Sequence, residues 1–112
     1  MKKIEAIIRP EKLGVVRKAL EEVGYAGLTI SDVRGHGAQR GIKEHFRGTE
    51  FIVDILPKVK VELVVPDSMS ARVVKEICDA ARTGAIGDGR VFVSTVDEAI
   101  RIRTGESGDA TL

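Results

Sequence analysis

The stretch KVKVELVV, residues 58–65, decides the fold because it alternates apolar and polar side chains. One face of a strand would carry Val59, Val61, Leu63 and Val65. The opposite face would carry Lys58, Lys60, Glu62 and Val64. A period of two with one apolar face is typical of a strand in an antiparallel sheet that is covered on one side.

Working outward from this strand, apolar alternation and turn residues predict four further strands, over residues 3–9, 27–35, 91–94 and 99–103. A helix is expected to begin at Pro10 and to end at Gly24, with an apolar stripe of Leu13, Val16, Leu20 and Val23. A second helix is expected to be capped by Asp67 or Ser68, with an apolar stripe of Val74, Ile77, Cys78 and Ala81. Cys78 is therefore interpreted as a small core residue rather than a reactive thiol.

The order of these elements, β-α-β-β-α-β followed by an extra short C-terminal strand, predicts an α+β domain. It is the ferredoxin-like arrangement, an antiparallel four-stranded sheet with both helices on one face. Because the other face of such a sheet is left uncovered, we expect a second chain to pack against it. The sequence therefore predicts an oligomer.

Length and charge restrict the possible functions. The 112 residues fit one domain, 1–112, without room for a separate catalytic domain. Lysine and arginine number 18 against 17 acidic residues, so no global field favours non-specific binding to nucleic acid or membranes. Cys78 is the only cysteine, which fits a reducing compartment, and a cytoplasmic location is expected.

The segment RTGAIGDGRVF, residues 82–92, is the first candidate for a binding site. Its glycines Gly84, Gly87 and Gly89 allow tight turns and a close approach of backbone NH groups to an anion. Arg90 adds a cation, and the later run IRIR would place Arg101 and Arg103 on one strand face. These residues could hold a polyanion such as a phosphate chain, although a turn without a ligand stays open as the alternative.

Residues 35–57 form the second unusual segment, because a compact domain rarely contains a loop of this length unless the loop is functional or disordered. The simpler alternative is an extended hairpin. His36 and His45 have no cysteine nearby, so no zinc site is expected there.

Over essentially its whole length the sequence resembles the PII signal-transduction proteins, a family of nitrogen regulators. The resemblance is densest in MKKIEAIIRP, GLTISDVRGHGAQRG, FRGTEFIVDILPKVKVELVV, ARTGAIGDGRVFVS and RIRTGE. It implies a homotrimer of ferredoxin-like subunits that is a sensor rather than an enzyme. Such proteins bind ATP or ADP in clefts between subunits, and 2-oxoglutarate joins Mg²⁺ and ATP there. A long T-loop, here about residues 36–55, then regulates an ammonium transporter or a nitrogen-assimilation enzyme such as glutamine synthetase. The resemblance implies no nucleic-acid partner. It implies contact with a membrane only through a channel partner.

The resemblance also assigns roles to individual residues, and no catalytic residue is among them. The nucleotide-binding positions are Ile7, Thr29, Gly35, His36, Gly37, Gln39, Glu62, Val64, Gly87, Asp88, Gly89, Arg90, Arg101 and Arg103. The 2-oxoglutarate positions are Gln39, Lys58 and Gly87, and Gln39 is also the Mg²⁺ ligand. The partner-binding positions in the T-loop are Arg47, Thr49 and Phe51, and a polar tail follows over residues 104–112.

Two departures from the family pattern change what is expected. Phe51 stands where the family carries the tyrosine that is uridylylated, so control by ligands alone is predicted. Ala38 stands where many members carry an arginine near the γ-phosphate, which should weaken discrimination between ATP and ADP. Thr49 replaces a serine that is phosphorylated in some members, so phosphorylation stays chemically possible.

Three other functions fit the sequence less well than a nucleotide sensor does. An RNA-binding module on this fold needs aromatic side chains on its central strands, and residues 58–65 contain none. An ATP-hydrolysing enzyme needs a base beside the phosphates, and Asp88 is the only carboxylate in the glycine segment. A structural trimer of the related divalent-cation-tolerance type would have no use for the glycines and arginines.

Overall fold

The computed structural model describes residues 1–35, 42–46, 49–53 and 55–112, with the backbone alone described between 42 and 53. One sheet is built from β1 (Lys2–Ile8), β2 (Thr29–Gly35), β5 (Leu56–Val65) and β6 (Arg90–Thr95). The spatial order is β2-β5-β1-β6, and every neighbouring pair is antiparallel. The sheet therefore confirms the predicted α+β, ferredoxin-like arrangement.

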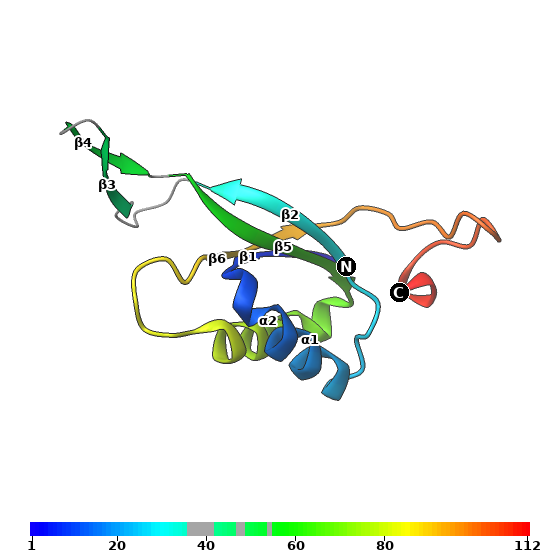
Figure 1. Cartoon of the computed structure of the whole chain (residues 1–112). Coiled ribbons are helices and arrows are strands. Elements are labelled where there is room, and N and C mark those ends of the chain that lie inside the picture. Colours follow the sequence, from blue (N-terminus) through cyan, green and yellow to red (C-terminus); the bar gives the residue numbers. More distant parts are fainter. Residues whose placement is uncertain (36–41, 47–48, 54) are drawn as a thin grey trace.

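Two helices cover one face of the sheet, as Figure 1 shows. A short 3₁₀ turn, η1 (Pro10–Lys12), leads into α1 (Leu13–Glu22), and α2 (Asp67–Ala81) follows β5. Pro10 begins the first turn because its fixed φ suits that position and its missing NH costs no hydrogen bond there.

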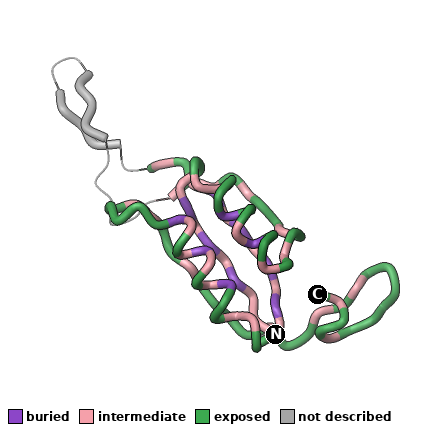
Figure 2. The backbone as a smooth tube through the Cα atoms, turned by 90° about the horizontal axis from the view of Figure 1, so that it is seen from below, coloured by how far each residue is buried: buried purple, intermediate pink, exposed green. Residues whose placement is uncertain are grey.

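The core lies between this face and the two helices, where Figure 2 shows the buried residues. All four apolar residues predicted for the inner face of β5 are buried, and Ile4, Ala6 and Ile8 of β1 face the same side. Val16 and Leu20 of α1 complete one side of the core, with Leu13 and Val23 packed at its edge. Each fully buried branched side chain contributes on the order of 1.5–3 kcal/mol.

The structure corrects the predicted details of α2. Pro66 occupies the N-cap position without any side-chain hydrogen bond, so neither Asp67 nor Ser68 caps the helix. The buried stripe is Val73, Ile77 and Ala81, while Val74 packs at the edge of the core. Cys78 is only half-buried and lines a cavity of about 170 Å³. The stripe was misplaced because residues 73 and 74 are both valine, and spacing alone does not show which of them faces the sheet.

The predicted extra strand over 99–103 is wrong. Only a single bridge joins Ile100 to Ser107, and the chain turns over residues 102–104 instead of extending. Ile100 and Ile102 are exposed, because within the described chain no neighbouring strand is available to pair with this segment. The polar tail ends in a 3₁₀ turn, η2 (Asp109–Thr111).

The segment between β2 and β5 contains two further strands, β3 (Ile42–Phe46) and β4 (Thr49–Val53). They pair antiparallel, from Ile42 opposite Val53 to Phe46 opposite Thr49. This segment therefore contains the hairpin that the sequence left open as an alternative to an irregular loop.

The face of the sheet opposite the helices is polar. Lys3 Nζ lies 2.9 Å from Glu5 Oε1, and Lys60 Nζ lies 3.0 Å from Glu62 Oε1. No helix of the described residues lies on this side (Figure 1). These charged side chains are partly exposed to solvent, so this face resembles a protein surface more than a second core. The expected second chain on this face stays a prediction.

Candidate functional site

The glycine segment forms a compact loop between the end of α2 and the start of β6. Helix α2 ends at Ala81, Arg82 is already extended, and β6 begins at Arg90. Gly84, Gly87 and Gly89 all have positive φ, at 89°, 104° and 100°. Side chains other than hydrogen are strained in this region of φ, so the loop depends on glycine at these places.

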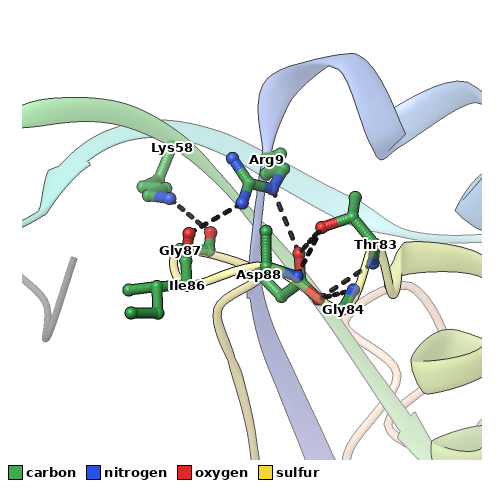
Figure 3. A network of polar contacts seen from close by, with 8 residues as sticks. Arg9, Lys58, Thr83, Gly84, Ile86, Gly87 and Asp88 are labelled. Atoms are coloured by element: carbon green, nitrogen blue, oxygen red, sulfur yellow. Dashed lines mark hydrogen bonds and ion pairs between the residues drawn. The ribbon is translucent and has the colours of Figure 1, made fainter.

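Asp88 closes the loop on itself through a set of hydrogen bonds that we call the Asp88 clasp (Figure 3). Its Oδ2 accepts hydrogen bonds from the backbone NH groups of Thr83 and Gly84, each at 2.9 Å. Its Oδ1 accepts from the Thr83 hydroxyl and, at 3.1 Å, from Nε of Arg9. The Asp88 carboxylate is therefore already hydrogen-bonded to donors within the chain. The group of Asp88 that could bind a ligand is its backbone amide.

The clasp also explains the acidity of Asp88. Hydrogen bonds from the Thr83 hydroxyl and the Thr83 amide lower the pKa of the Asp88 carboxyl far below its ordinary value, and those from Gly84 and Arg9 lower it further. Donors that bond to the charged form favour that form.

We therefore expect Asp88 to stay ionised well below pH 3.8, the ordinary value for an aspartate. Because the pKa is lower in the folded chain, the clasp adds stability above the unfolded-state pKa, and that contribution disappears as the pH falls through the folded-state pKa. An NMR titration of the Asp88 carboxyl carbon checks this. A midpoint near 3.8 would contradict the clasp.

Gly89 lies directly against the backbone of β1. A Cβ built on this glycine would lie 1.7 Å from the carbonyl oxygen of Ile7 and 2.8 Å from its carbonyl carbon. Ile7 is also the register partner of Arg90 in the β1–β6 pair. The absence of a side chain at residue 89 is therefore what allows the loop to enter β6 beside β1.

Two cations from neighbouring strands contact the middle of the loop. Nη2 of Arg9, just after β1, donates to the Ile86 carbonyl oxygen at 2.9 Å. Nζ of Lys58, near the start of β5, donates to the Gly87 carbonyl oxygen at 2.7 Å. The loop is thereby fixed to the end of the sheet at two successive peptide groups.

A cavity of about 610 Å³ opens beside the loop. The loop residues 85–90 form one wall, and Ile7, Lys58 and Phe92 of the sheet line it further. Val33, Arg34 and Gly35 contribute from the end of β2. The structure therefore brings seven of the expected ligand residues to one cavity: Ile7, Gly35, Lys58, Gly87, Asp88, Gly89 and Arg90.

Three expected residues lie farther along the polar face of the sheet and do not line this cavity: Thr29, Glu62 and Val64. Thr29 is the register partner of Glu62, and Glu62 pairs with Lys60. Val64 lies opposite Lys3. A ligand that reached these residues from the loop would extend across the open face of the sheet.

The single chain does not bring Arg101 and Arg103 to the loop, which corrects the expected convergence of three arginines. Ile7 pairs with Arg90 at one end of β1, whereas Lys2 pairs with Thr95 at the other. The tail after β6 therefore begins at the opposite end of the sheet from the loop, roughly 20 Å away for a seven-residue strand, as Figure 1 shows. There Arg101 bonds to the Ala110 carbonyl and pairs with Glu106.

The T-loop positions cannot be placed in the site. His36, Gly37, Gln39 and Arg47 lie outside the described residues, as does Ala38. Thr49 and Phe51 belong to β4, where only the backbone is described. Among the described residues, no group of histidine, cysteine or carboxylate side chains could hold a metal ion, and no helix is long and apolar enough to cross a membrane.

Sequence reasoning missed Arg9 and Thr83, although both bond to Asp88. Thr83 offered a local signal, because a hydroxyl close to an aspartate in a glycine-rich turn often bonds within that turn. Arg9 offered none, since 79 positions separate it from Asp88 and only the antiparallel β1–β6 pair brings them together.

Comparison with known proteins gives consistent matches over nearly the whole chain. The family model described as Nitrogen regulatory protein P-II matches residues 1–106. A protein of Bradyrhizobium diazoefficiens named Nitrogen regulatory protein P-II is 57% identical over 108 residues, which cover 96% of each chain. One of Escherichia coli (strain K12), named Nitrogen regulatory protein P-II 1, is 54% identical over 112 residues, 100% of each chain. A third, from Haemophilus influenzae, is 53% identical over 109 residues, 97% of each chain.

Proposed function

This chain belongs to the Nitrogen regulatory protein P-II family, and from that premise we propose that it senses ATP, ADP and 2-oxoglutarate. Members of this family are signal-transduction regulators, so the chain is a regulator of nitrogen metabolism and not an enzyme. The proposal concerns its ligands, its assembly and the way in which it reaches its targets.

The observation that carries the proposal is the glycine loop that forms one wall of the cavity. Its backbone is fixed by the Asp88 clasp, and Gly89 is too close to Ile7 for any side chain. A loop of this kind fits a phosphate chain, because backbone NH groups can approach the oxygens closely and Arg90 supplies a charge. We assign the phosphates to Gly87, Asp88, Gly89 and Arg90.

The location of the remaining ligand residues supports a homotrimer. Arg101 and Arg103 lie at the far end of the sheet from the loop, so they would reach a bound phosphate chain from another copy. The polar sheet face, which no helix of the described chain covers, is available for that contact. Ile7, Thr29, Glu62 and Val64, together with Gly35, His36 and Gly37, would hold the rest of the nucleotide.

The effector would act on the same loop. Lys58 already bonds to the Gly87 carbonyl oxygen. A carboxylate of 2-oxoglutarate that binds Lys58 would therefore act directly on the loop. Gln39 would hold the Mg²⁺, whose hard charge suits a neutral amide oxygen and phosphate oxygens. The bound metal would neutralise phosphate charge and give 2-oxoglutarate a place to bind.

The output would pass through the T-loop, residues 36–55, to a protein target in the cytoplasm. An ammonium transporter and a nitrogen-assimilation enzyme such as glutamine synthetase are the two classes of target. Arg47, Thr49 and Phe51 would contact it. A long cation such as Arg47 on a loop is suited to a narrow polar pore.

Calorimetric titration tests this proposal. The purified chain is titrated with ATP and ADP, and then with 2-oxoglutarate in the presence and absence of Mg²⁺ and ATP. We expect one nucleotide per subunit and 2-oxoglutarate binding only when Mg²⁺ and ATP are both present. A folded chain that binds neither nucleotide would contradict the proposal.

A further prediction concerns covalent control. Since a phenylalanine side chain has no oxygen to accept a nucleotidyl group, the chain should stay unmodified when it is incubated with a uridylyltransferase and UTP. The Phe51→Tyr variant is the matched control and should gain the mass of one uridylyl group per subunit. Modification of the unaltered chain, detected by mass spectrometry of intact subunits, would show that another residue accepts the group.

A further inference from the structure

Arg9 and Lys58 bond to two successive carbonyl groups of the glycine loop, those of Ile86 and Gly87. Figure 3 shows both oxygens turned toward these two side chains. Arg9 follows β1 directly and Lys58 lies near the start of the neighbouring β5, so both side chains approach the loop from the same end of the sheet. Two consecutive peptide groups of the loop are therefore held in one direction.

The direction of a carbonyl fixes the direction of the next amide. No peptide bond of the described chain is cis, and in a planar trans peptide the NH group points opposite to the carbonyl oxygen. Because the Ile86 and Gly87 oxygens point at the two cations, the amides of Gly87 and Asp88 point away from them. Within the part of the chain that the structure describes, neither amide donates a hydrogen bond.

We propose that Arg9 and Lys58 are positioning residues that aim the amides of Gly87 and Asp88 outward as an anion-binding pair. The ligand class is a phosphoryl group, which binds on the side of the loop opposite these cations. This inference rests on the proposed nucleotide function and adds to it the residues that preorganise the loop. Successive outward amides in a turn with positive φ are a known anion-binding arrangement.

The Asp88 clasp strengthens this arrangement in two ways. It ties Asp88 back to Thr83 and Gly84, so the turn keeps its shape without a ligand. It also pairs the carboxylate with Arg9, which reduces the repulsion that a bare carboxylate would exert on an approaching phosphate. Arg9 therefore contacts the loop at two points, the Ile86 carbonyl and the Asp88 carboxylate.

The orientation is tested first in the free chain, by NMR of the backbone carbonyl carbons. Lys58→Met should move the Gly87 carbonyl resonance upfield, and Arg9→Met should do the same for Ile86, because a carbonyl loses a charged donor in each case. Lys60→Met is the matched control, since Lys60 lines the same cavity and carries the same charge but pairs with Glu62. If neither resonance moves more than it does in Lys60→Met, the two cations do not hold these carbonyls and the proposal is wrong.

The second measurement uses ADP as the probe. Lys58→Met should weaken ADP binding about tenfold more than Lys60→Met does, because both variants lose one charge at the cavity but only one releases a peptide group. In the unaltered chain ADP should shift the amide resonances of Gly87 and Asp88, and the carbonyl resonances of Ile86 and Gly87 should not make the upfield move that the loss of each cation causes.

The outcomes separate this inference from the proposed function. If ADP binds and displaces the Ile86 and Gly87 carbonyls from the two cations, then Arg9 and Lys58 contact the phosphates directly and the positioning role is overturned. The same conclusion follows if Lys58→Met and Lys60→Met weaken binding equally. If the unaltered chain does not bind ADP at all, the nucleotide function fails, and the carbonyl measurement in the free chain still decides whether the two cations orient the loop.

Discussion

Gly89→Ala is expected to destabilise the chain by about 2 to 6 kcal/mol, the sum of a strained φ and a steric clash. The added Cβ would lie 1.7 Å from the Ile7 carbonyl oxygen at a residue whose φ is 100°. Since the clash is with backbone, no side-chain rotation relieves it, and β6 must separate from β1 near Arg90. Urea denaturation of the variant and the unaltered chain measures the loss.

Gly84→Ala is the matched control for this prediction. It makes the same substitution in the same loop, at a φ of 89°, but its Cβ would have no atom within 4 Å. The control should therefore lose only the strain energy, about 1 to 3 kcal/mol. Equal losses in the two variants would mean that the close approach of Gly89 to β1 has no energetic importance.

Arg103→Ala is expected to weaken ATP and ADP binding by about 10- to 150-fold, the effect of losing a charge-assisted hydrogen bond of about 1.5–3 kcal/mol. This loss would occur although Arg103 is separated from the glycine loop by the length of the sheet within one chain. Calorimetric titration of the variant and the unaltered chain measures it. An unchanged affinity for ATP and ADP would show that Arg103 is not part of the nucleotide site.

A mixing experiment shows whether the arginine acts from another copy. Arg90→Ala impairs the loop and Arg103→Ala impairs the tail, so trimers of either variant alone should bind nucleotide poorly. When the two are assembled together, an intact loop of one chain meets an intact tail of the other, and tight sites should reappear. If mixing restores no tight binding, the loop and the tail do not form one site across a subunit boundary.

The strand alternation of residues 58–65 correctly predicted which face of β5 is buried, because a period of two leaves only one apolar face. The helix pattern was less decisive, because the predicted stripe of α2 began at Val74 whereas the structure buries Val73. Adjacent apolar residues satisfy a period of 3.6 about equally well, and only the packing of the helix on the sheet selects one.

The C-terminal tail shows that an alternating pattern alone does not ensure a strand. The run IRIR alternates as a strand does, yet the chain turns at Ile102, because a strand exists only where a partner supplies hydrogen bonds. The glycine loop was recognised from its composition, whereas the contribution of Arg9 was not. A contact across 79 positions is a consequence of topology, and local sequence carries no sign of it.

Native mass spectrometry with ADP tests the central claim most directly, because it reports the number of subunits and the number of bound nucleotides together. We expect a trimer that takes up as many as three ADP molecules, and Arg103→Ala trimers that take up fewer at the same concentration. A chain that binds ADP as a monomer would contradict a site shared between copies, and a trimer that binds none would contradict the nucleotide-sensing function itself.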